Sequence, residues 1–185
     1  MEIEREELLR YLGYKGQEIN KELDEKISQA ISICKSTINP KHVLKKYKLN
    51  WEEKSLEGTT LIIKGESLWK HLSGCTYVYL IGATLGFEME KRIARAFNED
   101  RTLAVLLDSA ATCAIESYLD EVEKTLDGKL VSRYSCGYGD WPIEQQKEIC
   151  QVLDTARKIG LFVNSAYMLT PQKSVTAIIG IKDEY

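Results

Sequence analysis

The sequence predicts an α+β fold. Its 185 residues contain amphipathic helical stripes and also alternating or β-branched stretches, and these do not alternate regularly as in a doubly wound parallel sheet. No internal repeat, low-complexity segment or long linker divides the chain. We therefore expect one domain over residues 1–185, of which residues 1–40 form an N-terminal helical segment.

The helices are expected where apolar residues recur at helical spacing and end signals follow them. By this criterion helices lie at residues 4–13, 19–39, 67–74, 87–97 and 102–126, the last being the longest. One more helix should begin at Pro142, with Asp140 or Trp141 as its cap, and should end at Gly160.

The strands are expected where the sequence alternates or is rich in β-branched residues. Two strands are indicated between residues 42 and 63, the second at "TTLII" (59–63). The run 77–85 is apolar on both faces, which is typical of a central strand. A further strand is expected at "KLVSRYS" (129–135), and two more at the C-terminal end, joined at residues 170–173.

Composition and charge exclude several classes of function. The formal net charge of -3 gives no basic surface for nucleic acid, and the lysines of "KHVLKKYK" (41–48) are interpreted as a solvated face. The N-terminus is charged and no apolar run in the sequence is long enough to span a bilayer, so no membrane is expected. The five cysteines form no CxxC pair, which predicts reduced thiols in a cytoplasmic protein and no metal site.

The stretch "SRYSCGYGDWP" (132–142) is the main candidate for a functional site. A strand that ends in Arg133-x-Ser135-x-Gly137 presents a guanidinium and then bare backbone on one side. Gly137 and Gly139 allow positive φ, so Tyr138 between them should project from the loop. Such a loop can bind a carboxylate through Arg133 or a cation against the tyrosine ring. The alternative is an ordinary strand-to-helix turn.

The other candidates have weaker signals. Gly82 and Gly86 lie at the end of the central strand, just before a helix, but lack the dinucleotide-binding fingerprint, so close helix–strand packing is the simpler interpretation. Cys136 has no resolving cysteine or histidine nearby in sequence and is interpreted as a small apolar wall residue. Glu116 lies on the longest predicted helix, either as a ligand contact or as part of a solvated face.

Two motifs resemble the S-adenosylmethionine-binding reactivation domain of cobalamin-dependent methionine synthase. The first is the arginine, small residue and glycine-tyrosine pattern, present here as Arg133, Ser135, Gly137 and Tyr138 and followed by Pro142. The second is the turn in "MLTPQKSVTAIIG" (168–180). Within that family, "RYLGYKGQ", "ATLG" and "RYSCGYGDWP" are similar to stand-alone activation-domain-like proteins.

The resemblance implies a single C-shaped α+β domain with a twisted, largely antiparallel sheet flanked by helices. It also implies that Glu116, Arg133, Ser135, Gly137 and Tyr138 bind S-adenosylmethionine, with Tyr138 at the site of methyl transfer. The family's early aspartate has no counterpart in this sequence, and only Tyr185 lies near the position of its C-terminal tyrosine.

The function implied is reductive reactivation of a cobalamin-carrying protein, such as methionine synthase, in methionine biosynthesis. The chain would act as a methyltransferase-type component: it binds S-adenosylmethionine and delivers the methyl group to cobalt. The cobalamin would be carried by the partner, because the sequence has no Asp-x-His-x-x-Gly motif, and a flavodoxin- or ferredoxin-type donor would supply the electron. The alternative is a non-catalytic docking or chaperone subunit for a corrinoid methyltransferase.

Overall fold

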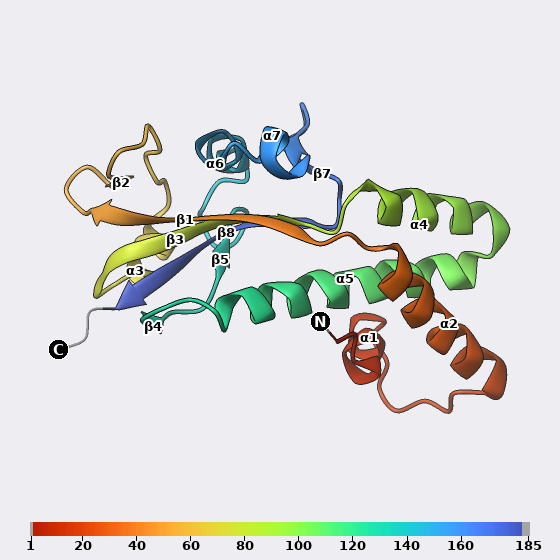
Figure 1. Ribbon diagram of the computed structural model, residues 1–185. Helices are drawn as coiled ribbons and strands as arrows, with labels where there is room; N and C mark the ends of the chain where they lie inside the picture. The colour runs from red at the N-terminus through yellow and green to blue at the C-terminus, as the bar shows by residue number, and fades with distance from the viewer. Residues whose placement is uncertain (1, 183–185) are drawn as a thin grey trace. The chain divides into compact units, whose positions relative to one another are not determined.

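A computed structural model describes residues 2–182 of the chain (Figure 1). The chain divides into two compact units, a helical unit formed by residues 1–40 and 85–125 and a sheet unit formed by residues 41–84 and 126–185. Tyr185 lies outside the described residues.

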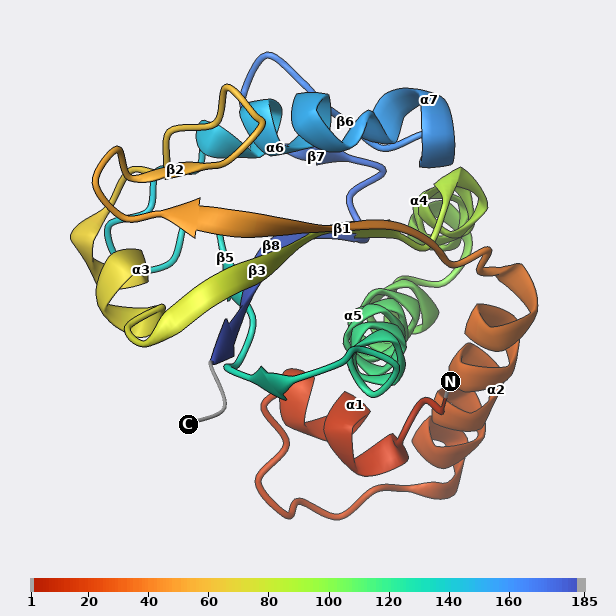
Figure 2. The same cartoon turned by 60° about the vertical axis from the view of Figure 1, so that its left-hand side comes forward.

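The helical unit is built around one long helix. Its four helices are α1 (Arg5–Tyr11), α2 (Lys21–Thr37), α4 (Phe87–Glu99) and α5 (Arg101–Glu123). Helix α5 packs against each of the other three, as Figure 2 also shows. Its buried residues include Leu103, Leu107, Ala110 and Ala114, so the stripe seen in the sequence is the face that forms the core.

Side-chain caps fix where the two longest helices of this unit begin. The Asn20 side chain accepts a hydrogen bond from the Leu23 N–H at 2.9 Å at the start of α2. The Asp100 carboxylate accepts one from the Leu103 N–H at 3.1 Å at the start of α5. Asp100 also lies 2.9 Å from the Lys26 ammonium group, which ties the start of α5 to α2.

Helix α5 is long and apolar enough to cross a membrane by length and composition alone. However, 61% of the most apolar 18-residue stretch of this helix is buried in the protein, as expected of a core helix.

The sheet unit contains one antiparallel sheet in the order β2-β1-β3-β8-β4, with β5 also pairing with β8. The strands are β1 (Lys41–Asn50), β2 (Ser55–Leu56), β3 (Cys75–Thr84), β4 (Lys129–Leu130), β5 (Tyr134–Ser135) and β8 (Ser174–Lys182). A separate short hairpin joins β6 (Phe162–Val163) to β7 (Leu169–Thr170). The predicted α+β class with a largely antiparallel sheet is therefore confirmed.

One side of this sheet carries the three helices of the unit and its main core. These helices are α3 (Glu66–His71), α6 (Gln145–Leu153) and α7 (Thr155–Ile159), and Figure 1 shows α6 and α7 together above the strands. Val78 and Leu80 of β3 and Ile178 of β8 are fully buried with Ile149 and Leu153 of α6. The predicted central strand is confirmed, since β3 lies between β1 and β8.

Three sequence predictions for this unit were wrong in detail. The stretch 59–63 forms only an isolated bridge at Ile62, and the second strand lies earlier, at β2. The stretch 129–135 is two short strands, β4 and β5, that pair with different parts of β8. The helix expected over 142–158 is divided into α6 and α7 because Asp154 adopts a left-handed conformation with φ 56°.

Candidate functional site

The loop that connects β5 to α6 is folded on itself by three backbone hydrogen bonds. The Gly137 N–H donates to the Trp141 carbonyl at 2.8 Å, and the Trp141 N–H donates to the Tyr138 carbonyl at 3.0 Å. The Tyr138 N–H donates to the Ser135 carbonyl at 3.3 Å. The loop is therefore a compact turn with its own internal hydrogen bonds.

Tyr138 projects from this turn as the sequence predicted. Gly137 and Gly139 have φ +90° and +55°, the region that favours glycine, and the side chain between them is 68% exposed. An exposed aromatic ring on a short, hydrogen-bonded turn is a surface that can contact a ligand or another protein.

Asp140 holds the loop against the start of α3. Its carboxylate accepts hydrogen bonds from the backbone N–H groups of Glu66 at 2.8 Å and Ser67 at 3.0 Å, and from the Ser67 hydroxyl. Hydrogen bonds from Ser67 keep the pKa of Asp140 below its ordinary value, because they stabilise the charged form. The prediction that Asp140 or Trp141 caps the helix after Pro142 was wrong: the N-cap residue of α6 is Glu144, and the Asp140 carboxylate binds the first N–H groups of α3 instead.

Trp141 anchors the other side of the turn. Its side chain is 1% exposed, and its indole N–H donates to the side-chain oxygen of Gln145 at 2.8 Å. Gln145 also accepts from the Lys64 N–H at 2.8 Å and donates to the Ile62 carbonyl at 2.7 Å. This buried polar network ties the loop and α6 to the segment before α3.

Tyr134 lies at the base of the loop and contacts three other aromatic rings. Its centroid is 5.1 Å from that of His71, 6.2 Å from that of Trp141 and 6.4 Å from that of Tyr138. Its hydroxyl is 2.9 Å from the Ser67 hydroxyl. These contacts place the ring under the exposed Tyr138, with an edge-on arrangement between the two tyrosines.

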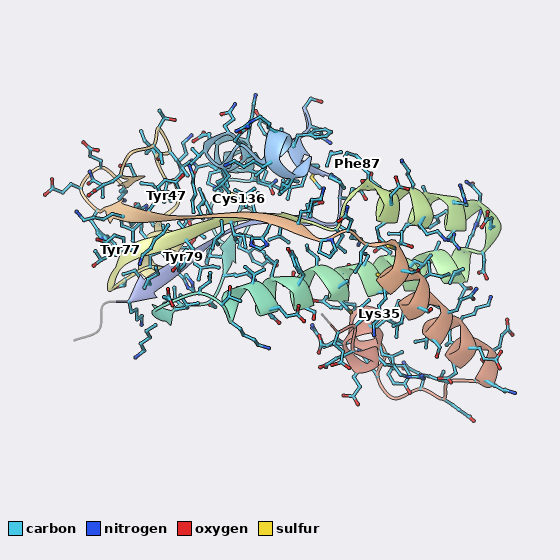
Figure 3. All side chains as sticks on the ribbon, viewed as in Figure 1. Lys35, Tyr47, Tyr77, Tyr79, Phe87 and Cys136 are labelled. Carbon is cyan, nitrogen blue, oxygen red and sulfur yellow. The ribbon has the colours of Figure 1, made fainter. Side chains whose placement is uncertain are left out.

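Cys136 is part of the wall of the unit rather than a reactive thiol. It is buried in the core between the sheet and α6, as Figure 3 shows. Burial raises its pKa far above the ordinary value, and the nearby Cys150 thiol raises it further. A thiol held in its neutral form is a poor nucleophile, so the interpretation of Cys136 as a wall residue is supported.

Four of the five predicted binding residues lie in this turn or in the short segment before it. Arg133 is half-buried beside Tyr134, while Ser135 is in β5 and uses its carbonyl to close the turn. Gly137 is exposed, and a Cβ added to it would approach only Ile143, at 3.7–3.9 Å. In chemical terms, a guanidinium can bind a carboxylate and an exposed aromatic ring can bind a cation.

Glu116, the fifth predicted residue, belongs to the helical unit. It is half-buried on α5 and lines a cavity of ≈ 340 Å³ between α1 and α5. Burial raises the pKa of Tyr11 in the same cavity, and the negative charge of Glu116 raises it further. Most of the lining is acidic, with Glu2, Glu4, Glu7, Asp120 and Glu121 around Glu116.

Ser67 and Tyr134 also contribute to this site, although the sequence alone does not indicate them. Their contacts join distant parts of the chain, since Ser67 lies 73 positions before Asp140 and 67 positions before Tyr134. The only local signal was the composition of the loop, in which Tyr134 and Asp140 accompany Tyr138 in "SRYSCGYGDWP".

Comparisons with known proteins identify the fold. No protein-family model and no curated protein sequence matches this chain. Among solved structures, the crystal structure of the MetH reactivation domain bound to AdoHcy matches with a TM-score of 0.66 and 16% sequence identity. The match covers 95% of this chain and 70% of that one. This chain therefore has the fold of the MetH reactivation domain, as its two sequence motifs suggested.

Proposed function

We propose that this protein binds S-adenosylmethionine at the Tyr138 loop and supports reductive reactivation of a cobalamin-carrying protein. The observation that carries the proposal is the exposed Tyr138 on a hydrogen-bonded turn that also contains Gly137 and that follows Arg133 closely in the chain. The likeness in fold to the MetH reactivation domain, whose solved structure contains AdoHcy, supports the choice of ligand.

Each loop residue has a separate task in this proposal. Arg133 binds the methionyl carboxylate through charge-assisted hydrogen bonds. Gly137 is exposed and has no side chain of its own, so a ligand can approach its backbone. Tyr138 lies beside the sulfonium, where its ring favours the positive charge and its hydroxyl can donate or accept one hydrogen bond. Glu116 is proposed as a contact for the amino group or the ribose.

The protein's contribution to the reaction would be to position the methyl donor. A flavodoxin- or ferredoxin-type donor supplies one electron to the inactive cob(II) form on the partner and produces the cob(I) nucleophile. The methyl group then passes from sulfur to cobalt, and S-adenosylhomocysteine leaves with the electron pair of the broken carbon–sulfur bond. No proton moves in this step, so the loop needs orientation and exclusion of water rather than a general base.

A second candidate function is a non-catalytic docking subunit for a corrinoid methyltransferase in the cytoplasm. The observation that favours it is the set of exposed apolar side chains on the sheet unit, which includes Tyr138, Ile143, Tyr167 and Met168. A docking surface of this kind needs the ring of Tyr138 but no S-adenosylmethionine.

The experiment that tests the proposal is a methylation assay with a cobalamin-loaded partner, S-adenosylmethionine and a low-potential reductant. The proposed function predicts methylcobalamin formation that depends on this protein. If the partner binds this chain but no methylcobalamin forms with any reductant, the docking function is the better account.

A further inference from the structure

We propose that helix α3 positions the Tyr138 loop, with Ser67 and Tyr134 as the positioning residues. This inference rests on the proposed function, because it assigns these residues a part in ligand binding. Neither side chain is needed to touch the ligand. Their role is to hold Tyr138 in one place before the ligand arrives.

Helix α3 contacts the loop and the segment just before it, residues 132–134, at three points along its length. At its first residues, the Glu66 and Ser67 N–H groups bind the Asp140 carboxylate. At its second residue, the Ser67 hydroxyl contacts both Asp140 and the Tyr134 hydroxyl. At its last residue, the His71 ring nitrogen Nε2 donates to the Ser132 carbonyl at 2.8 Å. In Figure 2 the chain after β5 accordingly runs beside α3.

The two segments approach so closely that a Cβ added at either of two glycines would collide with its neighbours. A Cβ added to Gly65 would lie 2.8 Å from the Asp140 carboxylate. One added to Gly139 would lie 2.3 Å from the Tyr134 hydroxyl and 2.5 Å from the Ser67 hydroxyl. Glycine at these positions is therefore required by the contact as well as by positive φ, which indicates a built junction rather than a loop that lies on the surface by chance.

The junction extends to Tyr138 through the Tyr134 ring. Ser67 fixes the hydroxyl of Tyr134, and the ring of Tyr134 contacts that of Tyr138 in an edge-on pair. A turn with two glycines would otherwise have many conformations available. The entropy lost in ordering it on binding would lower the affinity for the ligand. Restraint by α3 removes part of that cost, so the loop meets its ligand already ordered.

The test uses two single variants, their combination and a control. Tyr134→Phe keeps the ring and removes only the hydroxyl that faces Ser67, and Ser67→Ala removes the other partner of the same contact. The control is Thr59→Ala, because the Thr59 hydroxyl makes local hydrogen bonds with Leu56 and Leu61 in the same unit but none with the loop. AdoHcy affinity and hydrogen exchange of residues 132–141 are measured on the full chain, well below the melting temperature.

The expected result is an affinity about fivefold weaker in Tyr134→Phe, the factor that one ordinary hydrogen bond allows, and a larger loss in Ser67→Ala, because the Ser67 hydroxyl contacts both Tyr134 and Asp140. The double variant should bind AdoHcy more weakly than Tyr134→Phe only by the amount that the Ser67–Asp140 bond contributes. The losses of affinity in the two single variants should therefore be less than additive. Loop amides should exchange faster in all three, and Thr59→Ala should match the wild type in both measurements.

Two outcomes separate this inference from the proposed function. If the wild type binds AdoHcy and the Tyr134→Phe and Ser67→Ala variants bind equally well with unchanged loop exchange, the positioning role is overturned. If the wild type binds no AdoHcy, the proposed function fails. In that case, hydrogen exchange of residues 132–141 without ligand still tests whether α3 restrains the loop. Unchanged exchange in the variants overturns this restraint, and faster exchange upholds it.

Discussion

The Asp140 carboxylate accepts hydrogen bonds from both the backbone N–H and the hydroxyl of Ser67, a residue 73 positions earlier in the chain. Through this contact the turn that presents Tyr138 is attached to the start of a helix from a different part of the sequence. Because the bonds favour the ionised carboxylate, they lower the pKa of Asp140 and make the attachment dependent on pH.

Asp140→Asn is expected to change the acid limb of the stability curve. Because the pKa of Asp140 is lower in the folded state, its contribution is present above the unfolded pKa, about 4, and is lost as the pH falls through the folded value. The variant should therefore be less stable than the wild type at pH 7, and the two melting temperatures should converge in acid. Thermal unfolding between about pH 2.5 and 7 measures both.

Asp100 also contributes to the dependence of stability on pH, in the wild type and in Asp140→Asn alike. Its pKa is also lowered, mainly by the hydrogen bond from Lys26, and this contribution is the same in both proteins. A constant difference in melting temperature across the whole pH range would contradict the account of Asp140.

Gly139→Ala and Gly137→Ala form a matched pair of tests of the junction with α3. Both positions have positive φ, so each substitution should cost about 1 kcal/mol in backbone strain. At Gly139 the added Cβ also collides with Tyr134 and Ser67, whereas at Gly137 it meets Ile143 at an ordinary distance. Chemical denaturation should show a clearly larger loss of unfolding free energy for Gly139→Ala, and equal losses would argue against a close junction.

Local sequence patterns were sufficient to predict most helices, the central strand and the exposed tyrosine. Residues such as Leu103, Leu107 and Ala110 repeat at helical spacing, and this spacing depends only on neighbours in the chain. The exposure of Tyr138 follows likewise from the glycines on either side of it.

The attachment of the loop could not be predicted in this way, because it depends on partners far apart in sequence. Asp140 next to Pro142 has the local pattern of a helix cap, and only the folded chain brings the Glu66 and Ser67 N–H groups to it. The break at Asp154 was missed because its positive φ of 56° is uncommon for a residue other than glycine, and no glycine or proline interrupts residues 143–159.

Glu116→Gln should separate a binding role for Glu116 from a structural one. The substitution keeps the size of the side chain and removes its charge, so thermal stability should be nearly unchanged. The pKa of Tyr11 should move toward its ordinary value, because the Glu116 charge is one of the causes that raise it. A lower AdoHcy affinity is expected from the binding role, and a loss of stability with unchanged affinity would refute that role.

Tyr138→Phe tests whether the hydroxyl takes part in methyl transfer. The ring, which supplies most of the contact area, is retained, so partner binding should be unchanged. The rate of methylcobalamin formation should fall roughly tenfold, equivalent to about 1.4 kcal/mol, because the lost bond acts in the transition state. Equal rates for the variant and the wild type would exclude the hydroxyl from the reaction.

The most direct measurement is isothermal titration of the full chain with S-adenosylmethionine and AdoHcy, in parallel with Arg133→Ala. We expect saturable binding of both ligands to the wild type. Loss of the charge-assisted contact should weaken binding to the variant by about 1.5–3 kcal/mol while the protein stays folded. Absence of binding to the wild type at millimolar ligand, or equal binding by a folded Arg133→Ala protein, would contradict the assignment of the Tyr138 loop as the ligand site.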